Sequence, residues 1–300
     1  MNKSVLKGAI LVGLGACSYG MLTTFVKLAY EEGYTSHEIT FSQMALGLVG
    51  LLVINLFFGK KKKENSEKAG AMSKFKLIAA GTTLGLTSTF YYLAVKYIPV
   101  SIGIVLLMQS VWMGVVLEAV LQRKKPGLKK ILAVLAILAG TVLATNVMND
   151  TFSIDWRGIG WGMLAALSYT GTIYCSNTVS LNMPSLRRSL WMMVGGFLVV
   201  SAITGPYIVE EFNFDILIKW GLILALFGTI LPPLLYTAGM PKIEVGLGAI
   251  ISSIELPAAV LMAYFLLNER VDVFQWLGII LILMAVVQMN LKKRKRSNSE

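Results

Sequence analysis

The sequence predicts an all-α membrane protein in which ten transmembrane helices form two inverted five-helix repeats. The composition, the distribution of Lys and Arg, and an internal repeat support this fold class. Of the 300 residues, 56% are hydrophobic and only 14% are charged. Runs of about 20 apolar residues recur, each long enough to cross a hydrocarbon core of roughly 30 Å as a helix. The runs lie at 5–29, 38–59, 74–96, 99–122, 128–147, 157–178, 187–208, 216–239, 244–267 and 272–291.

The 27 Lys and Arg residues favour one side of the predicted membrane. With the N-terminus inside, 22 of them are cytoplasmic, and the other five are Lys27, Lys96, Arg157, Lys219 and Arg270. This asymmetry predicts a multi-pass protein of the cell inner (cytoplasmic) membrane with both termini cytoplasmic. The net charge of +11 therefore indicates contact with membrane lipid, and no nucleic-acid partner is expected.

Three other charged residues have ordinary structural interpretations. Lys27 and Lys96 are expected to extend their side chains to the outer lipid headgroups. Glu118 lies about one turn from the cytoplasmic end of its span, and we expect it to pair with Arg123.

An internal repeat relates the two halves of the chain. A shift of 150 residues aligns KGAILVGLGACSYG (7–20) with RGIGWGMLAALSYT (157–170). The identical positions include Gly8 and Gly158, Ser18 and Ser168, and Tyr19 and Tyr169. A shift of 146 aligns 123–143 with 269–289 in hydropathy. Each half holds five spans, an odd number, so the halves insert with opposite orientation, as in transporters with a substrate site at the midplane.

The segment LGACSYG (14–20) also has the shape of a lipoprotein cleavage site, with Cys17 as the first mature residue. Cleavage there would remove half of the first span and break the five-plus-five arrangement, and the second copy has Leu167 in place of Cys17. We therefore interpret the segment as the middle of an uncut transport helix.

Depth along each span predicts which polar side chains lie at mid-membrane. At ~1.5 Å per helical residue, four spans centre near Cys17, Ser110, Ser168 and Glu255. A spacing of three places Gln109 with Trp112, and Ser252 with Glu255, on shared helix faces. The predicted substrate pathway consists of Ser18, Tyr19, Tyr91, Tyr92, Gln109, Ser110, Trp112, Ser168, Tyr169, Tyr236, Ser252 and Glu255.

Glu255 is the strongest single candidate in this set. A carboxylate at mid-membrane costs several kcal/mol, so such acids face a cavity, pair with a polar group or titrate. Low dielectric favours the neutral form, which makes Glu255 a candidate for proton coupling; the alternative is a protonated side chain that only bonds a neighbouring helix. Pro232, Pro233 and Pro257 remove backbone donors and predict kinks, with or without a gating role.

The segment ELPAAVLMAYFLLNERVDVFQWLGIILILMAVV (255–287) carries Pro257 twelve residues before Glu269 and a closing helix led by Gly278. With this pattern the chain resembles the EamA-type branch of the drug/metabolite transporter superfamily over nearly its whole length. The resemblance implies a ten-helix fold with a cavity lined by the first, third, fourth, sixth, eighth and ninth spans. The first copy departs from the pattern, with no proline matching Pro257 and with Arg123 in place of Glu269. The repeats are placed at 1–148 and 149–291, followed by a basic cytoplasmic tail at 292–300.

The predicted function is secondary transport of a small metabolite: an amino acid, an amino-acid derivative or a planar heterocycle. The aromatic and hydroxyl lining favours such a substrate, and the outward direction follows from the resemblance alone. The alternatives are a facilitative importer or uniporter, a lipid scramblase and a membrane sensory partner. An enzyme is disfavoured because no histidine lies near Glu255, and no cofactor or metal is expected, since Cys17 and Cys175 lie inside spans. A homo-oligomer is one option, and the oligomeric state stays open.

Overall fold

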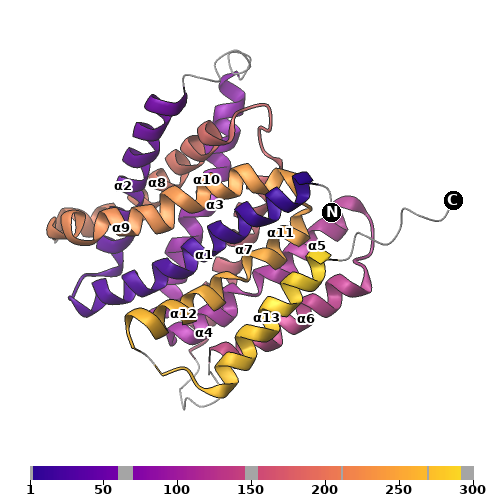
Figure 1. Cartoon of the computed structure of the whole chain (residues 1–300). Helices are drawn as coiled ribbons and strands as arrows, with labels where there is room; N and C mark the ends of the chain where they lie inside the picture. Colours follow the sequence, from indigo (N-terminus) through magenta and orange to yellow (C-terminus); the bar gives the residue numbers. More distant parts are fainter. Residues whose placement is uncertain (1–2, 60–69, 146–154, 211, 269, 292–300) are drawn as a thin grey trace.

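The computed structural model describes residues 3–59, 70–145, 155–210, 212–268 and 270–291, which form a bundle of helices (Figure 1). In the first half these are α1 (Lys3–Glu31), α2 (Ser36–Phe58), α3 (Ala71–Val95), α4 (Val100–Leu107), α5 (Ser110–Gln122) and α6 (Leu128–Ala144). The second half begins with α7 (Trp156–Thr178) and α8 (Ser185–Glu210). Two π-helical turns, Leu217–Gly221 and Leu226–Ile230, then flank α9 (Leu222–Ala225). They are followed by α10 (Leu231–Gly239), the 3-10 turn Met240–Lys242, α11 (Val245–Ser252), α12 (Glu255–Leu266) and α13 (Val273–Leu291).

The helical membrane architecture is confirmed, whereas the count of ten crossing helices stays a prediction. In the described part of the chain, six helical stretches are long and apolar enough to cross a membrane. They are Lys3–Glu31, Ser36–Phe58, Ile102–Gln122, Ser185–Ile208, Leu217–Lys242 and Val245–Leu266, and Val273–Met289 is a shorter apolar helix. The helices α3 and α7 are not in that set; both are rich in hydroxyl side chains and pack against each other, with the hydroxyls of Thr83 and Thr172 2.9 Å apart.

Two of the predicted spans are broken at mid-length, and the sequence predicted a kink in the second of them, at Pro257, but none in the first. The run 99–122 is divided into α4 and α5, and the run 244–267 into α11 and α12. Both breaks use i→i−3 hydrogen bonds, such as Gln109 N–H to the carbonyl of residue 106 (3.0 Å). Pro257 explains the second break, because it has no N–H to donate to the Ser253 carbonyl, which accepts from Leu256 instead (3.2 Å). The first break has no proline, so the sequence pattern gave no signal for it.

Glycines allow helices of the two halves to pack closely. A Cβ atom built on Gly81 of α3 would lie 1.8 Å from the Met192 carbonyl oxygen of α8, and one on Gly195 would lie 1.9 Å from the carbonyl oxygen of Ile78. Only glycine fits at such distances, and in lipid this close packing stabilises helix pairs. The other main pairs between the halves are α3 with α7, α6 with α13, α1 with α10 and α12, α2 with α8, and α5 with α11.

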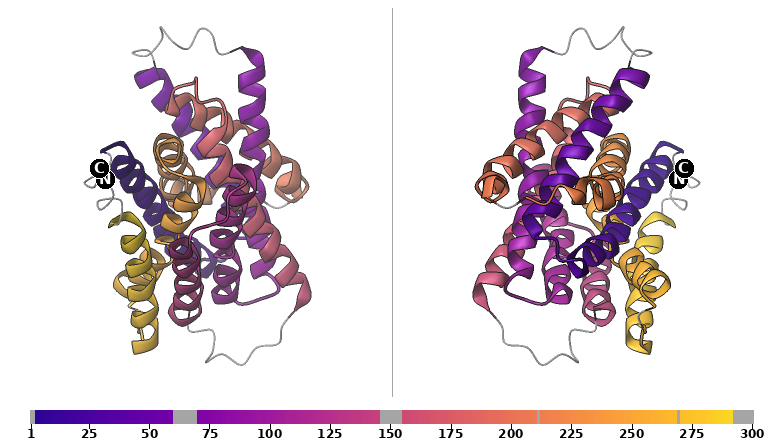
Figure 2. Two further views of the ribbon diagram at one scale, coloured as in Figure 1. Left: turned by 90° about the vertical axis from the view of Figure 1, so that its right-hand side faces the viewer. Right: turned by 90° about the vertical axis from the view of Figure 1, so that its left-hand side faces the viewer.

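The beginning of α1 and the end of α13 lie near each other in both views of Figure 2. The predicted basic tail 292–300 lies outside the described residues.

Candidate functional site

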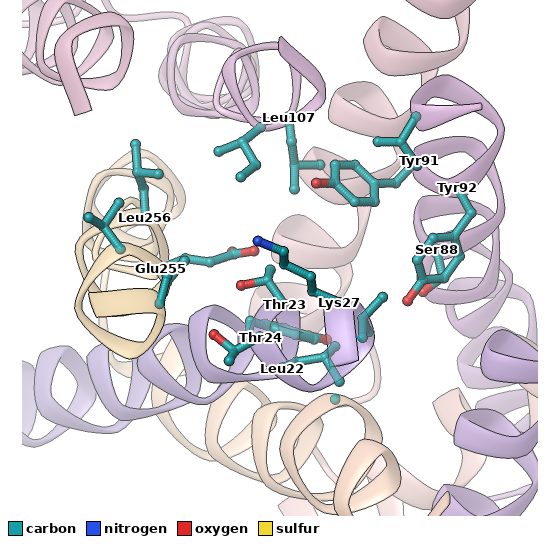
Figure 3. Close-up of a pocket in the computed structure, with 18 of the residues that line it drawn as sticks. Leu22, Thr23, Thr24, Lys27, Ser88, Tyr91, Tyr92, Leu107, Glu255 and Leu256 are labelled. Carbon is teal, nitrogen blue, oxygen red and sulfur yellow. The ribbon is translucent and has the colours of Figure 1, made fainter. Parts of the chain in front are cut away.

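A cavity of about 670 Å³ lies between helices of the two halves. This volume suits a small metabolite, since ligand pockets typically measure about 300–1,000 Å³. Its polar lining consists of Tyr19, Thr23, Thr24, Lys27, Tyr30, Gln43, Thr87, Ser88, Tyr91, Tyr92, Thr145, Tyr169, Thr172, Glu255, Arg270 and Gln275. Apolar side chains, among them Leu22, Leu107 and Leu256, complete the walls (Figure 3). Within the described residues, no group of three or more His, Cys, Asp or Glu side chains is placed to hold a metal ion.

Glu255 places a carboxyl group in this cavity (Figure 3). It is the first residue of α12 and directly follows the break in the ninth predicted span. Two backbone N–H groups of this first turn are already bonded across the break, that of Leu256 to the Ser253 carbonyl (3.2 Å) and that of Ala258 to the Ile254 carbonyl (3.1 Å). Lys27 of α1 and Tyr91 of α3 reach into the cavity from other walls (Figure 3). The cavity thus combines an acid, an amine and several hydroxyl groups.

A chain of hydrogen bonds leads from Glu255 into the protein. The Tyr169 hydroxyl lies 3.1 Å from Oε2 of Glu255 and 2.8 Å from the Tyr236 hydroxyl. Tyr236 in turn lies 3.0 Å from Oγ of Ser252, and Ser252 donates to the Gly248 carbonyl (3.0 Å). Tyr236 is only 1% exposed and Tyr169 only 4%. The chain therefore connects α12, α7, α10 and α11 away from the outer surface.

Tyr19 packs against the same tyrosines from α1. Its ring centroid lies 6.2 Å from that of Tyr169 and 5.8 Å from that of Tyr236, both in edge-to-face geometry. Aromatic pairs prefer this arrangement, because a positive ring edge meets a negative ring face. The aromatic residue of the repeated Ser-Tyr pair in each half thus lies at this site.

Five of the predicted pathway residues line the cavity. They are Tyr19, Tyr91, Tyr92, Tyr169 and Glu255. Tyr236 and Ser252 lie behind its wall, in the hydrogen-bond chain. The repeated serines instead join helices: Ser18 donates to the Phe227 carbonyl (2.8 Å), and Ser168 to the Thr83 carbonyl (3.3 Å).

The structure does not bring Gln109, Ser110 and Trp112 to the cavity. Trp112 is 36% exposed, and its Nε1 donates to Oε1 of Gln109 at 3.0 Å. Gln109 also donates to the Val105 carbonyl within its own chain segment (3.0 Å). Ser110 is buried, and its carbonyl accepts from the Thr170 hydroxyl (3.5 Å). These side chains therefore stabilise the region of the α4–α5 break.

The three predicted kink prolines lie at irregular helix starts. Pro232 and Pro233 are buried in the first turn of α10, directly after the π-helical turn Leu226–Ile230. Pro257 lies in the first turn of α12. Proline is compatible with these positions because the N–H groups of a first helical turn have no intrahelical acceptor.

Several cavity residues were not among the predicted pathway residues. Lys27 lines the cavity, whereas the sequence led us to expect it at the outer headgroups. Together with Tyr19, Thr23 and Tyr30 it forms a stripe at intervals of four, four and three residues, which is the spacing of one helix face and could have revealed it. Gln43 is also missed; it is 2% exposed, and its Oε1 has no hydrogen-bond partner among the described atoms.

An ion-pair cluster closes the bundle away from the cavity. Lys130 of α6 bonds both Glu118 of α5 and Glu244 (2.7 Å to the latter). The second oxygen of Glu118 accepts the Gly246 N–H of α11 at 2.6 Å. Glu118 therefore does not make the expected pair with Arg123, whose backbone turns away in the left-handed conformation at the end of α5. The cluster joins the first half to the second.

Arg188 of α8 joins three helices of the second half. It is 2% exposed, and its guanidinium donates to the carbonyls of Ser176 (2.7 Å), Val179 (3.0 Å) and Thr237 (2.9 Å). These carbonyls lie at the C-terminal ends of α7 and α10, where the helix dipole favours a cation.

Comparison with known proteins agrees with this arrangement. The model of the EamA-like transporter family matches residues 6–146 and again 156–291. The chain is 25% identical to an uncharacterized inner membrane transporter, YicL, of Salmonella typhimurium, over 99% of each chain. It is 20% identical to an uncharacterized transporter, YcbK, of Bacillus subtilis, over 98% of this chain and 96% of the other.

A crystal structure that is 14% identical in sequence shares the fold, with a TM-score of 0.76 over 95% of this chain and 98% of the other. The family match covers nearly the whole chain, and the apolar helices are those of a multi-pass membrane protein. This protein therefore belongs to the EamA-like transporter family and is a membrane transporter.

Proposed function

We propose that the protein is a secondary transporter that exports a small metabolite, namely an amino acid, an amino-acid derivative or a planar heterocycle. The observation that carries this proposal is the cavity of about 670 Å³ between the two halves. Its carboxyl, amine, phenol and hydroxyl groups offer both charges and many hydrogen bonds, and its tyrosines offer rings for stacking. A polar molecule of moderate size, with or without an aromatic ring, fits this chemistry.

We further propose that two inverted five-helix repeats move against each other to give alternating access. Equivalent contacts made by the two halves support this mechanism. Ser18 joins α1 to the turn before α10, and Ser168 joins α7 to α3. A Cβ atom on Gly8 would meet Gly239 and Lys242 at the end of α10, and one on Gly158 would meet residues 97 and 98 at the end of α3. Such reciprocal contacts are expected of repeats related by an axis in the membrane plane.

The proposed orientation places both termini in the cytoplasm. The split of 22 to five Lys and Arg supports it. In this orientation Lys27 and Tyr30 lie near the external end of α1 and Arg270 lies between the external ends of α12 and α13, whereas the Glu118–Lys130–Glu244 cluster lies at the cytoplasmic end. The structure then corresponds to a form whose cavity extends toward the outside and whose cytoplasmic end is closed.

Glu255 is the proposed site of proton coupling. Its carboxyl lies in the cavity, at the start of α12 and next to the Tyr169 hydroxyl. A neutral carboxyl is favoured by the low dielectric of the interior, and a carboxylate is favoured by the Tyr169 hydroxyl, which can donate to it. Both forms therefore have a source of stabilisation, as a group that exchanges protons during transport requires.

The decisive experiment has two stages. Metabolite profiling of medium and cytoplasm from deletion and overexpression strains identifies compounds whose distribution depends on the protein. Counterflow of those compounds in proteoliposomes then measures saturable exchange, with and without an imposed pH gradient. We expect export of one compound class, and we expect Glu255→Gln to abolish the dependence on the pH gradient. Glu31→Gln, at the exposed end of α1, is the matched control and should retain it.

The same measurements separate the other functions. Saturable exchange that is indifferent to the pH gradient in the wild-type protein would indicate a uniporter and contradict proton coupling. Accumulation of the compound inside cells would indicate an importer. Flipping of a fluorescent lipid in the vesicles, without exchange of any solute, would indicate a scramblase, and the absence of both activities would favour a sensory partner.

A further inference from the structure

The hydrogen-bond chain behind Glu255 contains more contacts than its hydroxyls can supply with hydrogens. Four contacts join Glu255, Tyr169, Tyr236, Ser252 and the Gly248 carbonyl, at 3.1, 2.8, 3.0 and 3.0 Å. Each contact needs one hydrogen, and each phenol or alcohol carries one. The two tyrosines and the serine supply three hydrogens for four contacts, so the state of Glu255 decides how the chain is arranged.

With a protonated Glu255, the fourth hydrogen is on the carboxyl group. Glu255 then donates to Tyr169, Tyr169 to Tyr236, Tyr236 to Ser252, and Ser252 to the Gly248 carbonyl. All four contacts are hydrogen bonds, and every hydroxyl points away from the carboxyl.

With an ionised Glu255, the three hydroxyls can donate in the opposite direction. Ser252 donates to Tyr236, Tyr236 to Tyr169, and Tyr169 to the carboxylate, and only the contact between Ser252 and Gly248 loses its hydrogen. The loss is small, because Gly248 lies inside α11, where its carbonyl also accepts the helical backbone bond. The proton itself leaves to water in the cavity.

We propose that Tyr169, Tyr236 and Ser252 are positioning residues for Glu255, whose hydroxyls reverse direction together when the carboxyl loses its proton. The reversal places a donor on the carboxylate, backed by two aligned hydroxyls. Hydrogen bonds to a charged acceptor are about twice as strong as neutral ones, and aligned bonds strengthen one another. This inference rests on the proposed proton coupling of Glu255 and specifies how the protein stabilises its ionised form.

In the described structure, the direct hydrogen-bond partner of the Glu255 carboxyl is the Tyr169 hydroxyl, which begins the hydrogen-bond chain. Other titratable or charged groups that face it or share its cavity are Tyr19, Lys27 and Tyr30 from α1, Tyr91 and Tyr92 from α3, and Arg270 beyond the end of α12. The elements α4, α6 and α13, which also border the cavity, contribute residues that do not titrate, such as Leu107, Ala144 and Gln275.

The test follows the protonation of Glu255 directly, without a substrate. Infrared difference spectra of the full-length protein in liposomes are recorded across a pH series, and the C=O band of the protonated carboxyl is assigned by its loss in Glu255→Gln. Tyr169→Phe keeps the ring and removes the donor, so ionisation becomes harder. We expect the pH at which the band is half-lost to rise by about one pH unit or more.

Two further variants test whether the hydroxyls act together. Tyr236→Phe should move the midpoint in the same direction by a smaller amount, and Ser252→Ala by the least. Adding Tyr236→Phe to Tyr169→Phe should cause little extra shift, because the chain is already cut, whereas independent effects would add. Tyr174→Phe, on the same helix as Tyr169 but outside the chain, is the matched control and should leave the midpoint unchanged.

Each outcome bears on the inference. A band that titrates with the wild-type midpoint in all three chain variants would overturn the cooperative chain and leave the proposed coupling standing. A band that does not titrate in the wild-type protein would overturn both. A shift in Tyr236→Phe without one in Tyr169→Phe would also refute the chain, because Tyr169 is the link between Tyr236 and the carboxyl.

Discussion

The contact between α1 and α12 at Gly20 gives a prediction with a clear magnitude. A Cβ atom on Gly20 would lie 2.2 Å from the Glu255 carbonyl oxygen and 2.7 Å from Cβ of Ala258. The first distance is more than about 1 Å short of an ordinary van der Waals separation. Gly20→Ala therefore forces α1 away from the start of α12, the segment that holds the Glu255 carboxyl in the cavity.

Two opposing terms determine the stability of this variant. Overpacking costs about 1–3 kcal/mol, whereas replacing glycine by alanine inside a helix gains about 0.8–1.0 kcal/mol. Gly13→Ala in the same helix separates the terms, since its Cβ would find Ile251 and Ile254 at 3.7 Å and meet no clash. The difference between the two variants should therefore be about 1–3 kcal/mol, with Gly20→Ala the less stable.

The assay combines thermal unfolding in detergent with counterflow of a profiled substrate in proteoliposomes. We expect Gly13→Ala to melt at or slightly above the wild-type temperature and to transport normally. Gly20→Ala should melt several degrees below Gly13→Ala and transport roughly tenfold slower or worse, because a displacement near 1 Å disrupts an aligned site. Equal melting temperatures and equal rates for the two variants would refute the packing argument.

Three further variants test the remaining contacts. Lys130→Met removes the ammonium between the carboxylates of Glu118 and Glu244, so we expect the cytoplasmic end of the bundle to open more often. The probe is Ala249→Cys at a buried position, whose thiol should react faster with a thiol reagent when Lys130 is replaced; an unchanged reaction rate would contradict the role of Lys130 in closing this end. Arg188→Gln removes the cation from three helix-end carbonyls and should lower stability by at least about 2 kcal/mol, which unchanged thermal unfolding would disprove. Lys27→Gln should raise the KM for a carboxylate-bearing substrate at least tenfold, whereas the control Lys96→Gln, outside the cavity, should leave the KM unchanged. Equal KM values for Lys27→Gln and the wild-type protein would remove Lys27 from the substrate site.

Depth was predictable from the sequence because it is a one-dimensional quantity. Helix rise per residue is constant, so distance from a span end gives depth, and Glu255 and Tyr169 were placed at mid-membrane on that basis. Both lie at the cavity. Pro257 indicated the break in the ninth span, whereas nothing in the sequence indicated the break in the fourth span, which has no proline at that point.

The direction in which a side chain points was much less predictable. Trp112 shares its depth with the cavity residues but lies outside the cavity, whereas Lys27, which is exposed, is one of the residues that line it. A soluble helix shows its buried face by an apolar stripe, but a membrane helix is apolar toward lipid and toward its neighbours alike. Only the packing of the other helices then decides which face meets the cavity.

The sequence by itself determined that this chain is a multi-pass helical membrane protein of the EamA-like transporter family, because composition, hydropathy and repeated segments are properties of the chain in order. The tertiary structure decided which of the mid-membrane polar groups meet. Tyr169 is 67 residues from Tyr236 and 86 residues from Glu255 in the sequence, and no local pattern encodes these contacts. The Tyr169 hydroxyl lies 2.8 Å from the Tyr236 hydroxyl and 3.1 Å from the Glu255 carboxyl because α7, α10 and α12 pack around one cavity.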